Sequence, residues 1–187
     1  MHAQGRQERE QSYPESLREP SMKFNRSRLL FGLYVLAVIL LTEIVTAYLK
    51  VSAWPAYLVW VMFFLEHMNP QRIAHILVGT ITGMILILLA PTIIGALARI
   101  MGPETGRLVY ILLSVYAIFA FGEMIPVILN NFTFLVITVA AVALAAPNPA
   151  PVQWLVVAVL GGGLMILATL LVGRAMGLPR PTLAHAP

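Results

Sequence analysis

Long apolar runs separated by short polar segments dominate the pattern along the chain. About 20 apolar residues cross the ~30 Å hydrocarbon core of a bilayer as an α-helix. Two of the runs are short, at 51–65 and 132–146, and the four main runs are 29–49, 73–98, 108–122 and 152–173. The pattern therefore predicts an all-α, polytopic transmembrane helical bundle of about six spans, formed by residues 22–176.

Composition excludes several classes of protein. The chain is 59% hydrophobic and 11% charged, and it contains no cysteine. Disulfides, thiol nucleophiles and cysteine metal sites are therefore excluded. The net charge of +4 is small and scattered, so we expect no nucleic-acid partner. The expected surroundings are the lipid bilayer and either further copies of the chain or another membrane subunit.

The flanking charges predict the orientation. Positive residues favour the cytoplasmic side of a membrane. Six spans place six positive residues inside and three outside, and the inner set includes Lys23, Arg26 and Arg28 before the first span. We therefore expect both termini in the cytoplasm of a bacterium, with the bundle in its inner membrane. Trp54 and Trp154 then lie at the outer interface, as in an aromatic belt.

Both ends of the chain are polar or rich in proline. Residues 1–21 lack periodicity and are expected to form a disordered or loosely held cytoplasmic tail, and translation from Met22 is an alternative. Residues 177–187 are expected to form a short Pro-rich cytoplasmic tail. The weakest span is 51–65, with about 15 apolar residues against the usual 17–25. A re-entrant hairpin is its alternative, and it would reverse the side of every later loop.

Two inner turns share a local pattern of an aromatic residue, Glu, Met and Pro. Their glutamates are Glu66 and Glu123, 57 positions apart. The pattern is open to two interpretations: an internal repeat of the kind found in transporters, or chance similarity between two interfacial turns.

The second of these turns is the first candidate for a polar pocket. Gly122 and Pro126 together break a helix, and broken helices in membranes often form solute or ion sites. The alternative is an ordinary loop in which Asn131 caps the next helix. The residues assigned to the pocket are Glu123, Asn130, Asn131 and Thr133, with Arg72 and His75 from the neighbouring loop.

Glu43 is a carboxylate inside the first span. Such a residue is a functional hypothesis by default, here a proton relay or the partner of a cation, although it can also extend towards the interface near Lys50. His67 and His75 are separated by Pro70, which disrupts the helical spacing of a metal pair, so no metal site is expected. No catalytic motif or cofactor fingerprint is present, and we expect neither enzymatic activity nor a cofactor.

Small residues indicate where helices pack. A small-xxx-small motif lets two backbones approach closely, and Gly79 and Gly83 form one around Thr80 and Thr82. Gly161, Gly162 and Gly163 are assigned the same role in the last span. Pro91 is expected to kink the third span.

The order of these features resembles a known group. It runs from Trp54-Pro55-Ala56-Tyr57 through Asn69-Pro70-Gln71-Arg72 and the Gly79 motif to an Asn-Asn-Phe-Thr turn and a Gly-rich last span. It is similar to small six-span bacterial inner-membrane proteins of a family of unknown function. In outline it is also similar to the membrane half of fusaric-acid-resistance and aromatic-acid exporters and to HPP-type membrane proteins. The exporters' large cytoplasmic domain and the His-Pro-Pro signature are absent here.

The resemblance implies a compact helical bundle and transport of a small organic solute as one possible activity. Two functional hypotheses follow. The chain is either a small permease or channel for an organic solute or anion, or a non-catalytic accessory subunit of a larger membrane complex.

Overall fold

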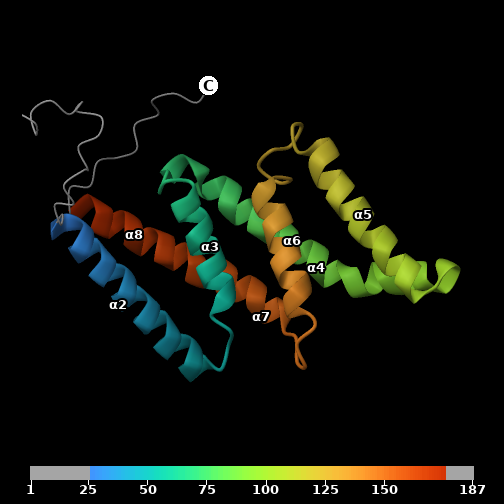
Figure 1. The fold of residues 1–187 in the computed structure, drawn as a ribbon, viewed down its shortest axis with the longest axis horizontal. Helices are drawn as coiled ribbons and strands as arrows, with labels where there is room; N and C mark the ends of the chain where they lie inside the picture. Colours follow the sequence, from blue (N-terminus) through green and yellow to red (C-terminus); the bar gives the residue numbers. More distant parts are fainter. Residues whose placement is uncertain (1–25, 176–187) are drawn as a thin grey trace, which may run out of the picture. The chain divides into compact units, whose positions relative to one another are not determined.

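The computed structural model describes residues 26–175, and every regular element in this range is a helix (Figure 1). The all-α prediction is confirmed. The expected tails, 1–21 and 177–187, and the start at Met22 lie outside the described residues. The elements are α2 (Arg26–Leu49), α3 (Trp54–Leu65), η2 (Pro70–Arg72), α4 (Ile73–Met101), α5 (Pro103–Phe121), α6 (Asn131–Ala143), α7 (Pro151–Val156), η3 (Val157–Gly162) and α8 (Gly163–Ala175).

Four helical segments are long and apolar enough to cross a membrane. Their bounds are Leu29–Leu49, Pro70–Met101, Pro103–Phe121 and Pro151–Ala175. Two shorter apolar helices complete the set, α3 with 12 residues and α6 with 13. At ~1.5 Å per residue they are about 18 and 20 Å long, well below the ~30 Å of a hydrocarbon core.

The start of α5 differs from the predicted span, which began at residue 108. Gly102 ends α4 with a φ of 87°, a conformation that glycine adopts without a steric penalty. Pro103 then occupies the first turn of α5, and Glu104 follows in the same turn. Proline and acidic residues both favour a helix start, so the helix begins before the apolar run does. In α4 the helix continues through Pro91 to Met101.

The chain divides into two compact units inside α2, between Leu36 and Ala37. In the described part of the first unit, residues 26–36, the rings of Phe31 and Tyr34 have centroids 6.1 Å apart. The second unit contains the end of α2 and all later helices.

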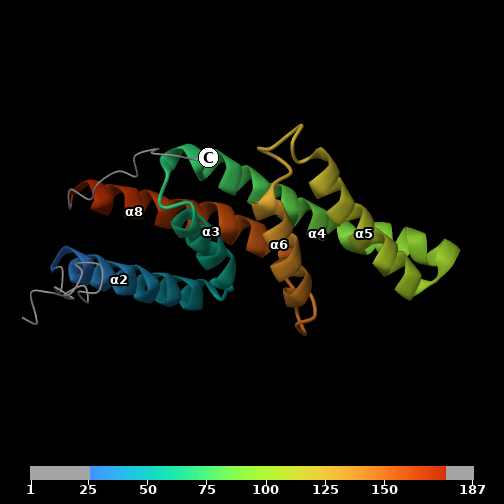
Figure 2. The ribbon, with the colours of Figure 1, turned by 45° about the horizontal axis from the view of Figure 1, so that its top comes forward.

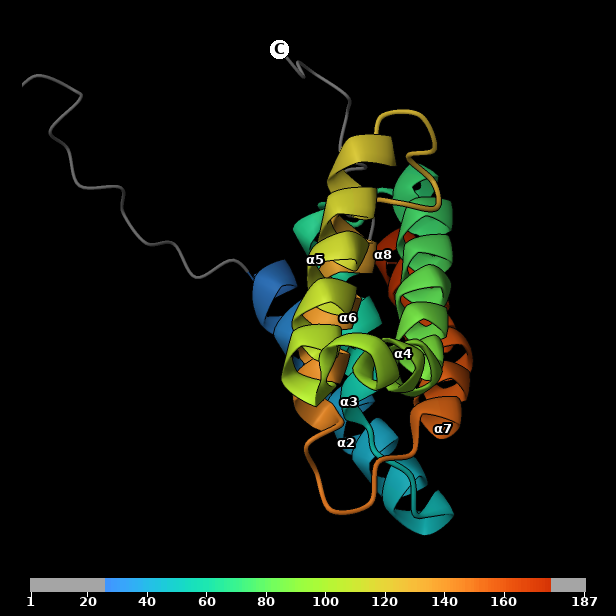
Figure 3. The ribbon, with the colours of Figure 1, turned by 90° about the vertical axis from the view of Figure 1, so that its right-hand side faces the viewer.

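Within the second unit α4 packs against α5 and α6, while α3 packs against η3 and α8. Figure 3 shows α5 alongside α4, and Figure 2 shows α6 crossing α4. α5 approaches α4 closely, because a Cβ added at Gly106 would lie 2.9 Å from the backbone nitrogen of Ala98. The fully buried large side chains include Phe63, Met62, Ile76, Met84 and Val136.

Candidate functional site

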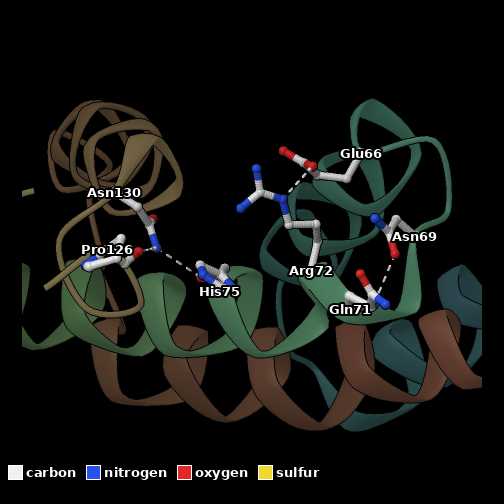
Figure 4. Close-up of polar contacts among 7 residues, drawn as sticks. All are labelled: Glu66, Asn69, Gln71, Arg72, His75, Pro126 and Asn130. Carbon is white, nitrogen blue, oxygen red and sulfur yellow. Dashed lines mark hydrogen bonds and ion pairs between the residues drawn. The ribbon is translucent and has the colours of Figure 1, made fainter. Parts of the chain in front are cut away.

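The joint between α5 and α6 is organised by one side chain, that of Asn130. Its Oδ1 accepts hydrogen bonds from the backbone N–H groups of Phe132 and Thr133 at 3.0 and 3.1 Å. This is N-capping, so the cap is Asn130 and the alternative that placed it at Asn131 is wrong by one residue. The Nδ2 of Asn130 lies 3.0 Å from the carbonyl oxygen of Pro126 and 3.1 Å from that of His75 (Figure 4).

Asn130 also connects α6 to α4. A Cβ added at Gly79 would lie 2.5 Å from Asn130 Oδ1, so only glycine leaves room for this amide. Thr133 is fully buried beside it and donates its hydroxyl to the carbonyl oxygen of Ile128 at 2.7 Å. The structure therefore brings together Asn130, Thr133 and the backbone of His75.

These contacts leave little capacity for a ligand. The N–H groups of Phe132 and Thr133 at the start of α6 already donate to Asn130. An amide side chain offers two N–H donors and one acceptor oxygen, and Asn130 uses all of them within the protein. The side chain therefore has a structural role at this joint.

The other predicted pocket residues lie outside this group. Glu123 and Asn131 are exposed, and no hydrogen bond or ion pair to the Glu123 carboxylate is found among residues 26–175. Arg72 Nε lies 3.1 Å from Glu66 Oε2, in its own loop (Figure 4). The six residues therefore do not form one pocket in the single chain.

The loop that holds Arg72 has its own local order. Asn69 Oδ1 accepts from the backbone N–H of Gln71 at 3.0 Å and caps η2 (Figure 4). His67 has a φ of 53° in the turn before it. In α4, His75 is half-buried and its Nδ1 is buried without a hydrogen-bond partner. No cluster of three metal-ligating side chains occurs in the described part of the chain.

The 57-residue similarity between the two turns does not reflect equivalent structures. Glu66 follows the short helix α3 and leads through η2 into the long helix α4. Glu123 follows the long helix α5 and leads into the short helix α6. An internal repeat at that spacing is therefore wrong.

Glu43 has a partner that the sequence did not predict. Its Oε1 accepts a hydrogen bond from the Tyr57 hydroxyl at 2.8 Å, which joins the end of α2 to the start of α3. Thr42 and Thr46 instead donate to backbone carbonyls of their own helix. Glu43 is exposed in the single chain and, of the acidic residues in the described part of the chain, it lies farthest inside a helix.

The glycines of the packing motifs divide into contacting and open positions. A Cβ added at Gly83 would lie 2.8 Å from Val136 Cβ, one at Gly161 would lie 3.0 Å from Ala56 Cβ, and one at Gly162 would lie 2.6 Å from Val59 Cβ. Gly163 has no atom within 4 Å of such a Cβ. Gly163 therefore does not share the packing role assigned to it.

Three tryptophans connect helices that are distant in sequence. The ring of Trp54 contacts that of Trp154 edge-on, with centroids 5.3 Å apart. Trp154 is buried, so it packs inside the protein and does not face an interface. Trp60 Nε1 donates to Thr169 Oγ1 at 2.8 Å, both residues being buried. Their separation of 109 positions leaves no local signal in the sequence.

The fold and its joints define an all-helical protein whose four longest helices have the length and composition of membrane spans. Beyond that class, no protein-family model, curated protein or solved structure matches the chain. The resemblance to small six-span inner-membrane proteins therefore stays a prediction.

Proposed function

We propose that the chain is a small inner-membrane permease or channel for a small organic solute or anion, with six crossings and both termini in the cytoplasm. The observation that carries this proposal is the pair of short helices. α3 and α6 are each about 10 Å too short for the hydrocarbon core, so non-helical backbone lies at membrane depth beside each. Such backbone is tolerated only where it is buried in protein or lines water.

The joint before α6 is the part that we assign to the water-lined path. Residues 123–128 are all exposed in the single chain, and they follow one another in turns instead of a helix. A water-filled approach to this joint would satisfy its outer backbone groups and would admit a solute. Glu123, at its edge, is the charged residue that a solute entering from this side would meet.

Two contacts between the starts of helices are consistent with six crossings. Trp54 and Trp154 begin α3 and α7 and pack together, so these two helices start on one side. Asn130 and His75 lie at the starts of α6 and α4 and are joined by a hydrogen bond, so these helices start together as well. Six crossings place the first pair outside and the second pair inside.

The proposal is tested by solute flux into proteoliposomes, followed by stopped-flow light scattering with urea, acetate and benzoate as probes. We expect flux of at least one probe above that of protein-free liposomes, and a several-fold reduction by Glu123→Gln. Glu104→Gln is the matched control, because it removes the same charge at the far end of α5 and should leave flux unchanged. Background flux for every probe would overturn the proposal.

Background flux would favour the second function, an accessory subunit of a membrane complex. The observation behind this alternative is the filled interior of the second unit. Phe63, Met62, Ile76 and Met84 are fully buried, and the buried hydroxyls of Thr80 and Thr169 donate to carbonyls of their own helices.

A further inference from the structure

The two short helices correspond position by position. α6 begins 77 positions after α3. At that spacing Leu58-Val59 coincides with Leu135-Val136, and the aromatic Tyr57 with Phe134. The buried residues Ala56, Val59 and Phe63 of α3 coincide with the buried residues Thr133, Val136 and Ala140 of α6.

The long helices that follow them correspond in the same way. The segment α7–η3–α8 begins 78 positions after α4. At this spacing seven residues are identical, including two glycines and an alanine: Leu77/Leu155, Val78/Val156, Gly83/Gly161, Leu86/Leu164, Leu89/Leu167, Ala90/Ala168 and Gly95/Gly173. Four buried positions also coincide: Ile76/Trp154, Thr80/Ala158, Met84/Gly162 and Ile87/Met165.

The packing of these helices is crossed between the two halves. α3 of the first half packs on η3 of the second, where Val59 meets Gly162. α6 of the second half packs on α4 of the first, where Val136 meets Gly83. Each short helix thus lies on the long helix of the other half, as Figure 1 shows. A two-fold relation between the halves produces this reciprocity.

The direction of the helices shows which kind of two-fold relation it is. α3 and α6 run in opposite directions in Figure 1, and so do α4 and α7–α8. From the start of α3 to the start of α6 the chain passes through three long or short helices, α3, α4 and α5. If each of these helices crosses the membrane once, an odd number of crossings separates the two copies. The second copy is then inserted with inverted topology, as in transporters with inverted repeats.

We propose that residues 54–101 and 131–175 are two copies of one helical unit inserted with opposite orientations. The joints that precede their short helices, residues 50–53 and 122–130, then open to opposite faces of the membrane. Asn130 and Thr133 organise the inner joint, and the Glu43–Tyr57 pair lies beside the outer joint. Assigning these joints as the two mouths of a solute path rests on the proposed function, whereas the inversion does not.

Because the chain has no cysteine, single cysteines can report on which side each joint lies. Four exposed positions serve: Ser52, Gln71, Met124 and Asn148. Each is changed to Cys in the full chain, and a membrane-impermeant maleimide is added to intact spheroplasts and then to permeabilised ones. We expect Ser52→Cys and Asn148→Cys to react in intact spheroplasts, and Gln71→Cys and Met124→Cys only after permeabilisation.

Reaction of Ser52→Cys and Met124→Cys from the same face would overturn the inversion. If one of these variants fails to fold, Gln71→Cys and Asn148→Cys decide the same question. These outcomes do not depend on flux, so an absence of transport with opposite-face labelling would reject the proposed function alone.

Disulfide cross-linking tests the crossed packing. One pair is taken from each crossing: Val59→Cys with Gly162→Cys, and Val136→Cys with Gly83→Cys. Their Cβ separations of 2.6 and 2.8 Å need only a small opening to reach the ~3.8 Å typical of disulfides. Both pairs should cross-link on mild oxidation, and Val59→Cys with Gly163→Cys should not. Cross-linking of one pair without the other would contradict the crossed packing.

Discussion

At the crossing of α3 and η3, the three atoms nearest to a Cβ added at Gly162 all belong to Val59, whereas at the crossing of α6 and α4 a Cβ added at Gly83 would meet Val136 and also the carbonyl oxygen of Thr133. The first crossing lies on a segment of π-helix, and the second on regular α-helix. Both crossings bring backbones together through glycine. The approach is therefore limited by a side chain at the first crossing and by both a side chain and backbone at the second.

The crossings also differ in their polar connections. Trp60 of α3 donates a hydrogen bond to Thr169 of α8, and the equivalent position in α6 is the apolar Ile137. The second crossing is secured by Asn130, whereas Ala53, the residue before α3, makes no side-chain cap. Each crossing therefore has its own polar contact, in a different place.

The largest expected effect on stability comes from adding a methyl group to the glycine at each crossing. Gly162→Ala and Gly83→Ala should each lower the free energy of unfolding by about 1–3 kcal/mol, because overpacking strains the neighbours. Val59→Ala removes the two Cγ atoms that lie 2.7 and 3.2 Å from the added Cβ but leaves Val59 Cβ at 2.6 Å, so it should restore Gly162→Ala only in part. Val136→Ala should restore Gly83→Ala less, because the carbonyl oxygen of Thr133 remains at 3.0 Å in addition to Val136 Cβ at 2.8 Å. Thermal unfolding of the purified protein in detergent measures these changes.

The controls are glycines with open surroundings. Gly163→Ala and Gly95→Ala place a methyl group where no atom lies within 4 Å, and alanine favours a helix by up to about 1 kcal/mol over glycine. Neither control should destabilise the protein. Equal rescue at both crossings would show that backbone does not limit the second one.

The next effect concerns the cap of α6. Asn130→Ala should cost about 0.5–2 kcal/mol through the lost N-cap. Asn130→Asp keeps an acceptor for the N–H groups of Phe132 and Thr133 but loses the donor to the carbonyl oxygen of His75, so its loss should be smaller. If Asp and Ala were equally destabilising in thermal unfolding, the contact with α4 would outweigh the cap.

Much of the helical architecture follows from apolar length alone. All six predicted runs are helical in the structure, because a long apolar segment in a membrane satisfies its backbone groups best as a helix. The start of α5 was missed because Gly102, Pro103 and Glu104 act through local backbone and charge effects, not through hydropathy.

The candidate site was harder to predict, because its contacts depend on packing. The sequence predicts Asn130 as a pocket residue. In the structure its side chain makes all its hydrogen bonds within the protein, and the bond to His75 requires the close approach of α4 at Gly79. The partner of Glu43 lies on another helix, at Tyr57. The similar turns around Glu66 and Glu123 suggest a spacing of 57, whereas the repeat proposed above has spacings of 77 and 78, at which the buried faces of the helices also coincide.

A smaller effect is expected from the hydrogen bond that only the first crossing has. Trp60→Phe and Thr169→Val each remove one partner, and a double-mutant cycle isolates the coupling between them. We expect a coupling of about 0.5–1.5 kcal/mol, the usual net contribution of one hydrogen bond. The Thr169 hydroxyl keeps its bond to the carbonyl oxygen of Met165 in Trp60→Phe, so that variant should be the milder of the two. A coupling near zero would mean that packing alone secures the crossing.

The smallest effect on stability is expected at Glu123, which lies in the joint between α5 and α6 and takes no part in the second crossing. Its side chain is exposed, and surface substitutions away from specific contacts usually change stability by less than about 0.5 kcal/mol. Glu123→Gln should therefore unfold at the same temperature as the unchanged protein, even if it reduces solute flux. Arg72→Gln is the informative comparison, because it breaks the 3.1 Å ion pair with Glu66, a partly exposed pair of the kind worth about 0–1 kcal/mol. A clear loss of thermal stability in Glu123→Gln would reveal a packing partner for this carboxylate, and its loss of flux could then no longer be assigned to the solute path.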